Sequence, residues 1–120
     1  MQSPLDIEFN PSSRQATATL HLRGHAGYRE AMQLRDALFE AIEVSRDKNL
    51  VVELQEVQRI DTAAMAVLVE GLVATHEDGP TVFLVGPNES VRRVFELAGL
   101  EDALLRCYSC WGDFEQAMTA

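Results

Sequence analysis

Asp61 and Thr62 are the residues whose types and position best suit chemistry on a hydroxyl group. They end the polar segment Gln58-Arg59-Ile60-Asp61-Thr62, where an apolar helical pattern begins. An Asp at this place can accept hydrogen bonds from the exposed N–H groups of a first helical turn. Thr62 would follow with its hydroxyl near solvent, at a helix end that favours an attached phosphate, and phosphorylation would add about two negative charges. Taken alone, the pair is better explained as ordinary capping, because Asp and Thr are preferred caps anywhere.

A second pair of residues has the CxxC spacing, in Cys107-Tyr108-Ser109-Cys110. Such a pair can carry a redox function, or can bind zinc when two further ligands are present. The sequence has no second CxxC and no paired His, so we expect no zinc site. The pair is expected between a strand and a helix, which suits redox chemistry. Cysteine is also a common small buried residue, and this interpretation is favoured.

The other residues with chemical potential do not form a recognisable catalytic pattern. His21, His25 and His76 lack metal-ligand spacing and are expected on the solvated surface. There is no GxGxxG, Walker loop, HExxH or nucleophile elbow. The sequence therefore predicts a protein that is not an enzyme and has no cofactor and no metal.

Charge and length narrow the class of partner. The chain has 120 residues, which is enough for one domain, and we expect residues 1–120 to form it. Its formal net charge is -9, which argues against nucleic acid and anionic membranes as partners. The start, Met1 to Leu5, does not resemble a signal peptide, and the apolar stretch 63–74 contains Glu70 and is too short to span a bilayer. We therefore expect a cytoplasmic protein without direct membrane insertion.

The elements that position these residues follow from alternation and from helical spacing. Gly24-His25-Ala26-Gly27 is expected to break the second strand, and Asn10-Pro11-Ser12-Ser13 has turn chemistry. Asn88 is a good N-cap, and Gly99 suits the residue after a helix. The expected strands are Asp6–Phe9, Thr17–Arg23, Leu50–Leu54, Thr81–Val85 and Leu104–Tyr108. The expected helices are Tyr28–Ser45, one from Asp61 or Thr62 to the stop at Glu77-Asp78-Gly79-Pro80, one from Asn88 to Ala98, and Trp111–Met118.

The order of these elements is ββαβαβαβα. Strands that alternate with helices after an initial hairpin imply right-handed crossovers between parallel strands. The predicted fold class is therefore α/β, with a single mixed, mostly parallel β-sheet and helices packed on it.

This pattern resembles a STAS domain, the fold of bacterial anti-sigma factor antagonists, over almost the whole chain. The resemblance includes the hairpin from Ile7 to Arg23 and the strand Leu50-Val51-Val52-Glu53-Leu54 with a loop ending in Ile60-Asp61-Thr62. It continues through Thr81 to Pro87 and through Asn88-Glu89-Ser90-Val91-Arg92-Arg93-Val94-Phe95-Glu96-Leu97-Ala98-Gly99-Leu100, which is similar to the family's third helix.

The resemblance implies a regulatory function. In the antagonists, an anti-sigma factor that is also a serine/threonine kinase phosphorylates a Ser or Thr just after a loop Asp, which blocks binding to that kinase, and a metal-dependent phosphatase restores binding. Asp61 matches the loop Asp and Thr62 the phosphoacceptor. Asp61, Thr62, Ala63, Ala64 and Met65 are then the expected partner-binding residues. Small alanines at the helix start would let another protein approach closely.

The sequence also departs from the family pattern, and an alternative function stays open. After the acceptor the antagonists usually have Ser or Thr, then Gly, then Leu, where this chain has Ala63, Ala64 and Met65. STAS-like domains also occur as small subunits of transporters, including lipid-transport ATPase complexes. There the Asp-Thr pair would belong to a constitutive docking surface on a transporter ATPase subunit, without phosphorylation.

Overall fold

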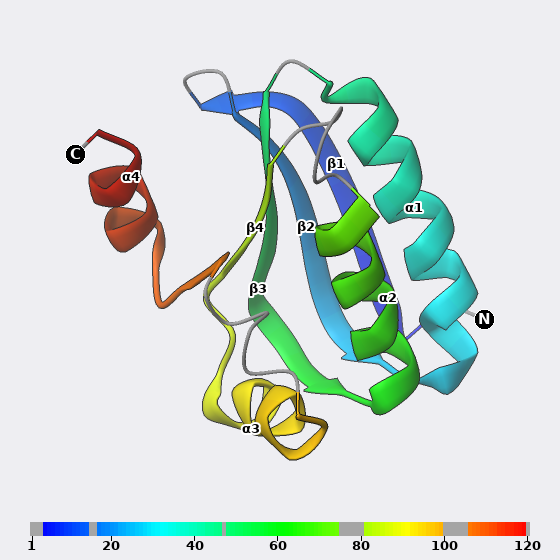
Figure 1. Ribbon diagram of the computed structural model, residues 1–120. Helices are drawn as coiled ribbons and strands as arrows, with labels where there is room; N and C mark the ends of the chain where they lie inside the picture. Colours follow the sequence, from blue (N-terminus) through cyan, green and yellow to red (C-terminus); the bar gives the residue numbers. More distant parts are fainter. Residues whose placement is uncertain (1–3, 15–16, 47, 75–80, 100–105, 120) are drawn as a thin grey trace.

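The computed structural model describes residues 4–14, 17–46, 48–74, 81–99 and 106–119. A hairpin is followed by strands that alternate with helices, which confirms the predicted order (Figure 1). The strands are β1 (Leu5–Arg14), β2 (Thr17–Ala26), β3 (Asn49–Ile60), β4 (Val82–Val85) and β5 (Cys107–Tyr108). The helices are α1 (Ala31–Val44), preceded by a short 3-10 turn at Tyr28–Glu30, then α2 (Thr62–Ala74), α3 (Glu89–Leu97) and α4 (Trp111–Thr119).

The strands form one sheet in the order β1-β2-β3-β4-β5. β1 pairs antiparallel with β2, and the other neighbours pair in parallel. This confirms the predicted mixed, mostly parallel sheet. Because β2 and β3 are parallel, their carboxyl ends meet at the same edge, where Ala26 is paired with Ile60.

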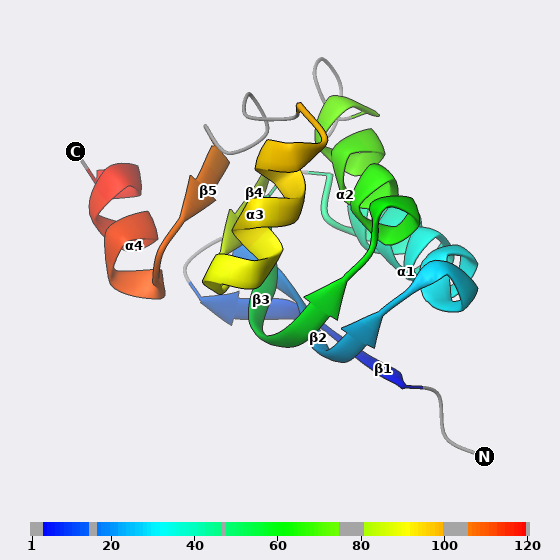
Figure 2. The ribbon, with the colours of Figure 1, turned by 90° about the horizontal axis from the view of Figure 1, so that it is seen from below.

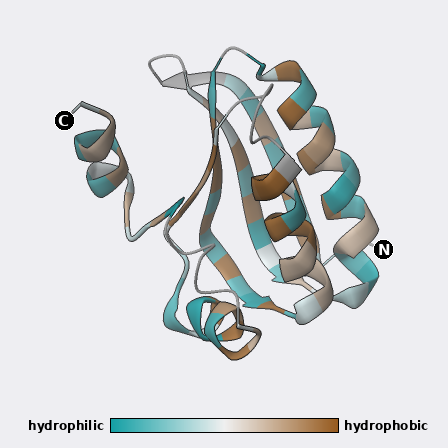
Figure 3. Cartoon of the chain, in the orientation of Figure 1, coloured by the Kyte–Doolittle hydropathy of each residue, from teal (hydrophilic) through white to brown (hydrophobic). Residues whose placement is uncertain are grey.

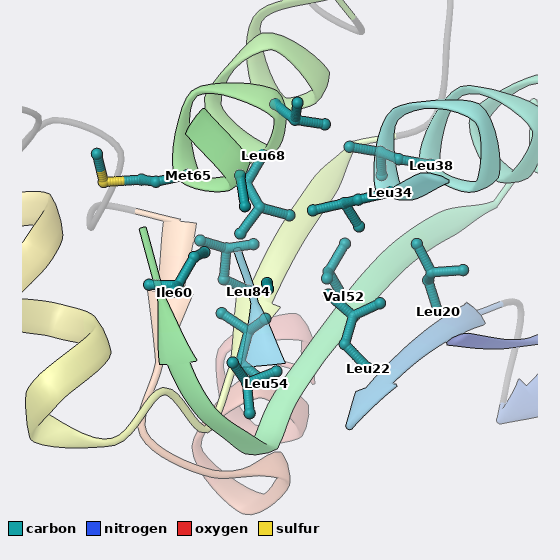
Figure 4. Close-up of a cluster of buried hydrophobic side chains, with 14 of the residues drawn as sticks. Leu20, Leu22, Leu34, Leu38, Val52, Leu54, Ile60, Met65, Leu68 and Leu84 are labelled. Atoms are coloured by element: carbon teal, nitrogen blue, oxygen red, sulfur yellow. The ribbon is translucent and has the colours of Figure 1, made fainter. Parts of the chain in front are cut away.

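The main core lies between one face of the sheet and helices α1, α2 and α3. Figure 4 shows leucines of β2, β3 and β4 beneath the inward side chains of α1 and α2. Leu34 and Leu38 of α1 and Leu68 of α2 are at most 1% exposed. In Figure 3, α2 carries mostly brown and pale residues, so this helix is apolar well beyond the side that faces the core.

A second, smaller cluster covers the opposite face of the sheet near β4 and β5. Phe114 of α4 packs on Phe83, with the two ring centroids 5.1 Å apart, and on the β3 residue Val51. Side chains alternate along a strand, which explains why Val51 belongs to this cluster while Val52 belongs to the main core. Figure 2, a view along the sheet from below, shows α4 standing apart from α1 and α2.

Strands β1, β2 and β3 are longer than the alternation of polar and apolar residues predicted. β1 continues through the expected turn at Asn10–Ser13, with a shift in register between Asn10 and Arg14. β3 extends to Ile60, so Gln58 and Arg59 lie in a strand and not in a loop. The exposed polar residues of this extension break the apolar pattern from which a strand is predicted. β2 continues beside the extension and pairs with it as far as Ile60. The expected helix stop at residues 77–80, His76 and the start of the last strand lie outside the described residues.

Gly24 is the residue that lets β2 continue past the predicted break. Its φ is +99°, in the region that L side chains rarely adopt. The register of β2 against β3 shifts on either side of it, between His21 and Arg23 and between Gly24 and His25. β2 thus continues past Gly24 with a local irregularity and ends at Ala26. This places the start of α1 beside the start of α2.

Candidate protein-docking site at the start of α2

The site forms where β2 and β3 end side by side. The backbone N–H of Asp61 donates to the carbonyl oxygen of Ala26 at 3.1 Å, so the residue that follows β3 is tied to the end of β2. The same turn holds the beginning of α2, because the N–H of Met65 donates to the carbonyl of Asp61 at 3.0 Å. The start of α2 is therefore fixed by the parallel sheet itself.

The Asp61 carboxylate caps α2, as the sequence predicted. Its Oδ1 accepts hydrogen bonds from the N–H of Ala63 at 3.0 Å and of Ala64 at 3.1 Å. These are donors that have no partner within the helix. Thr62 is the first residue of α2 and its side chain is exposed. The cap thus places an exposed threonine at the first position of α2.

A neighbouring carboxylate closes the turn between β2 and α1. Glu30 Oε1 accepts a hydrogen bond from the N–H of Gly27 at 3.0 Å. A Cβ at residue 27 would lie 2.9 Å from this oxygen and 3.8 Å from Asp61 Oδ2, so the two helix starts are close together. Sequence reasoning missed Gly27 and Glu30 as parts of the site. The signal was present, because a Glu three residues after a turn residue is capping-box spacing.

The five residues expected to bind a partner do not share one environment. Asp61 and Ala63 are half-buried and Thr62 is exposed. Ala64 and Met65 are 0% and 2% exposed and belong to the main core, so they point away from any docked protein. Helical geometry turns these two positions toward the sheet, and the expected surface narrows to Asp61, Thr62 and Ala63.

The outer side of α2 continues this surface with apolar residues. Ala66 and Val73 are exposed and Val69 is half-buried. Thr62, Ala66, Val69 and Val73 follow helical spacing, and we call them the α2 stripe. Glu70 is the only charged residue of α2, and it pairs with Arg35 of α1, Nη2 to Oε1, at 2.9 Å. On the 3-10 turn and on α1, Tyr28 and Met32 are 78% and 66% exposed.

Comparison with known proteins identifies the family. The model of the family described as Mlab, STAS domain, matches residues 9–106. The chain belongs to the STAS domain family. A crystal structure of an anti-sigma factor antagonist from Mycobacterium paratuberculosis has a similar fold, with a TM-score of 0.81, 16% identity and 100% of each chain covered.

Two further solved structures share the STAS fold at low identity. SpoIIAA, described as a Bacillus cell fate determinant and solved in its phosphorylated form, gives a TM-score of 0.63 at 14% identity over 94% of this chain and 99% of the other. A sulfate transporter family protein from Wolinella succinogenes gives 0.68 at 20% identity over 83% and 82%. The STAS fold is therefore found both in anti-sigma factor antagonists and in a transporter family protein.

The environment of Cys107, the first thiol of the CxxC pair in this STAS domain, disfavours its reactive form. Cys107 packs against the main core, and burial raises the pKa of its thiol although the guanidinium of Arg92 opposes this. A raised pKa lowers the fraction of reactive thiolate. Cys110 is exposed at the start of α4, where its carbonyl accepts from the N–H of Phe114 at 3.2 Å, and both thiols are free.

His21 and His25 of the STAS domain contact polar side chains of β3. His21 Nε2 lies 2.9 Å from Glu56 Oε2 and 3.5 Å from Glu53 Oε1, and His25 Nε2 lies 3.0 Å from Gln58 Oε1. Within the described ranges, no three His, Cys, Asp or Glu residues are grouped to hold a metal ion. None of the helices placed by the structure is long and apolar enough to cross a membrane.

The Asp61 cap can be tested by substitution. We expect Asp61→Ala to lower the free energy of unfolding by about 1 kcal/mol, because two N–H groups of α2 lose their acceptor. Asp61→Asn keeps an accepting oxygen and should lie close to the wild type. Urea unfolding followed by circular dichroism measures both, and equal losses in the two variants would contradict a capping role.

Proposed function

We propose that this STAS domain is a non-catalytic regulatory module of the cytoplasm that binds a kinase-type anti-sigma factor through the start of α2 and the α2 stripe. Phosphorylation of Thr62 switches the interaction. The observation that carries the proposal is the exposed residue Thr62 at the start of a helix capped by Asp61.

The chemistry of the switch requires only access to Thr62 Oγ1. A kinase partner transfers the γ-phosphoryl group of ATP to this oxygen, the hydroxyl proton is lost, and ADP leaves. The product carries about two negative charges at the end of a surface whose other members are apolar. A partner that packs on Ala66, Val69 and Val73 would then have to bury a strongly hydrated group. A metal-dependent phosphatase that hydrolyses the ester restores the binding surface.

The apolar outer side of α2 supports protein binding as such. A helix at the surface of a protein normally has polar residues on its outer side. Here that side has one charged residue, Glu70, which is already paired with Arg35. Contiguous exposed apolar residues beside a polar rim are typical of interaction surfaces.

Phosphorylation provides the direct test. The protein is incubated with Mg-ATP and a kinase-type anti-sigma factor, and its peptides are analysed by mass spectrometry. We expect phosphate on Thr62, none in Thr62→Ala, and an unchanged yield in Ser90→Ala. Ser90 is a matched control because it is an exposed hydroxyl in the first turn of α3.

Binding by calorimetry completes this prediction. Phosphorylated protein should bind the same kinase at least about tenfold more weakly, which corresponds to about 1.4 kcal/mol. The switch would be refuted by an unmodified Thr62 peptide under conditions that phosphorylate a known antagonist.

A constitutive STAS subunit of a transporter complex is the second candidate. Ala63 and Ala64 favour it, because the resembling antagonists have a hydroxyl residue and a glycine at these two positions. The fold is also shared with a sulfate transporter family protein. On this proposal the same α2 stripe docks on an ATP-binding-cassette subunit without phosphorylation. Co-purification from the native cell with such subunits, and not with sigma-regulatory proteins, would distinguish it.

A further inference from the structure

The outer edge of β1 is a second surface with features of a binding site, on the other flank of α1 from α2. β1 is the first strand of the sheet, and within the described part of the chain no strand pairs with its outer edge. Edge strands present unpaired N–H and C=O groups that can pair with another strand. Figure 2 shows β1 at the end of the sheet.

The hydrogen bonds of the β1–β2 hairpin identify which backbone N–H and C=O groups of β1 point away from β2. The N–H of His25 donates to the carbonyl of Pro4 at 3.0 Å, and Leu5 is paired with Gly24. In an antiparallel ladder, a bond between the residues that flank a pair means that the pair itself is not hydrogen-bonded. Leu5 and Gly24 are such a pair, so the N–H and C=O groups of Leu5 point away from β2. The side chain of Gln33 confirms it, because its Nε2 donates to the carbonyl of Leu5 at 3.2 Å. By alternation, Ile7 and Phe9 present their N–H and C=O groups to an incoming strand.

A groove lies beside these same two residues on the side of α1. Ile7 and Phe9 are half-buried, and they line it together with Gln33, Ala37, Glu40 and Ala41. Its volume is about 270 Å³, below the roughly 300–1,000 Å³ of small-molecule sites. The small side chains of Ala37 and Ala41 leave room for an apolar side chain carried by an added strand.

The other side of β1 is acidic. The side chains of Asp6 and Glu8 are 70% and 65% exposed, and both contact Arg23, at 2.9 Å each. The same guanidinium also contacts Glu56 at 3.0 Å. Three carboxylates thus share one cation, and this face of β1 keeps an excess of negative charge.

These negative charges favour a basic partner protein over a second copy of this chain at the edge of β1. In an antiparallel β1–β1 pair with Ile7 on the symmetry axis, Asp6 of each copy lies opposite Glu8 of the other, and like charges in such pairs are destabilising. The net charge of -9 adds to the repulsion. A strand with basic residues at these positions is complementary instead.

We propose that the outer edge of β1 binds an extended segment of a partner protein in which apolar and basic residues alternate. The segment adds a strand to the sheet through Ile7 and Phe9. Its apolar residues enter the groove beside α1, and its basic residues face Asp6 and Glu8. This surface is separate from the α2 stripe, so its occupancy does not depend on Thr62.

The probe is an eight-residue peptide in which lysine alternates with valine, titrated into the ¹⁵N-labelled full chain. We expect saturable shifts of the amide signals of Asp6–Asn10 and of Gln33–Ala37, and slower hydrogen exchange at Ile7 and Phe9. A peptide of the same composition with the alternation scrambled, and one with glutamate for lysine, should bind at least about tenfold more weakly.

Charge variants of the protein complete the test. Glu8→Lys should weaken binding of the lysine peptide about five- to tenfold, with Glu8→Gln in between. Glu96→Lys makes the same charge change on the exposed side of α3 and should change binding less than about twofold. The proposal is overturned if all three peptides bind equally, if no saturable shift occurs at millimolar peptide, if the shifts fall on α2, or if the unliganded protein dimerises through β1.

Discussion

Replacing Phe95 by alanine should lower the free energy of unfolding by about 3–5 kcal/mol, the usual range for a phenylalanine lost from a core. Phe95 is 0% exposed, and it shares the inner side of α3 with only one other buried residue, Val91. Side chains of the sheet and of α2 pack against α3 in the same core, so little of the resulting cavity can collapse. Loss of this ring removes most of the contact that holds α3 on the sheet.

Urea unfolding followed by far-UV circular dichroism measures this effect. Leu97→Ala is the matched control, because Leu97 lies on the same helix and is 82% exposed. It should change stability by no more than about 0.5 kcal/mol. Similar losses in the two variants would mean that α3 does not depend on its buried face.

Gly24→Ala should be the second large loss, roughly 2–4 kcal/mol, for two separate reasons. The φ of +99° is strained for any residue with a side chain. In addition, a Cβ at this position would lie 2.2 Å from the carbonyl oxygen of Pro4, which is backbone and cannot rotate away. The chain entering β1 must shift, and the hydrogen bond from His25 to Pro4 shifts with it.

Gly99→Ala separates strain from crowding. Gly99 has a φ of +73°, but a Cβ there would meet nothing within 4 Å. It should therefore show only the backbone contribution, about 1–2 kcal/mol. Thermal unfolding of both variants gives the comparison. If Gly24→Ala proves no more harmful than Gly99→Ala, the contact with Pro4 does not constrain the hairpin.

The order of elements and both helix caps could be predicted from the sequence because each depends on local patterns. Alternation marked β2, helical spacing marked α1, and the predicted caps are confirmed: Asp61 accepts from Ala63 and Ala64, and Asn88 Oδ1 accepts from the N–H of Val91 at 2.8 Å. These signals lie within a few residues of the feature that they specify, so tertiary contacts did not override them.

The apolar spacing of Met65, Leu68, Val69 and Leu72 predicts one side of α2, and Met65, Leu68 and Leu72 are buried, but the limits of that side are weakly marked. A helix shows its inner side by the contrast between apolar and polar residues, and α2 has a single charged residue among thirteen. The contrast between apolar and polar residues therefore does not separate the buried Ala64 from the exposed Ala66 and Val73. The nearly uniform apolar composition of α2 obscures which of its residues face the core. The same composition makes the outer side of α2 a candidate docking surface.

The acidic face of β1 escaped prediction for a different reason. Arg23 meets Asp6, Glu8 and Glu56 only because three strands are aligned, and the β2–β3 register shifts twice near this point. A slip of one residue would send these side chains to the opposite face. Such an arrangement depends on long-range pairing, which residue patterns along one strand do not specify.

The two apolar clusters on opposite faces of the sheet have a consequence for how the molecule opens. The α4 layer is held by a few rings and by the indole N–H of Trp111, which donates to Glu53 Oε2 at 2.9 Å. We expect it to detach as a local unit while the larger cluster stays closed, since cooperative units often coincide with such separate packing. Trp111 is the only tryptophan of the chain. Its fluorescence therefore follows the departure of α4, whereas global melting is followed by the dichroism of the whole backbone.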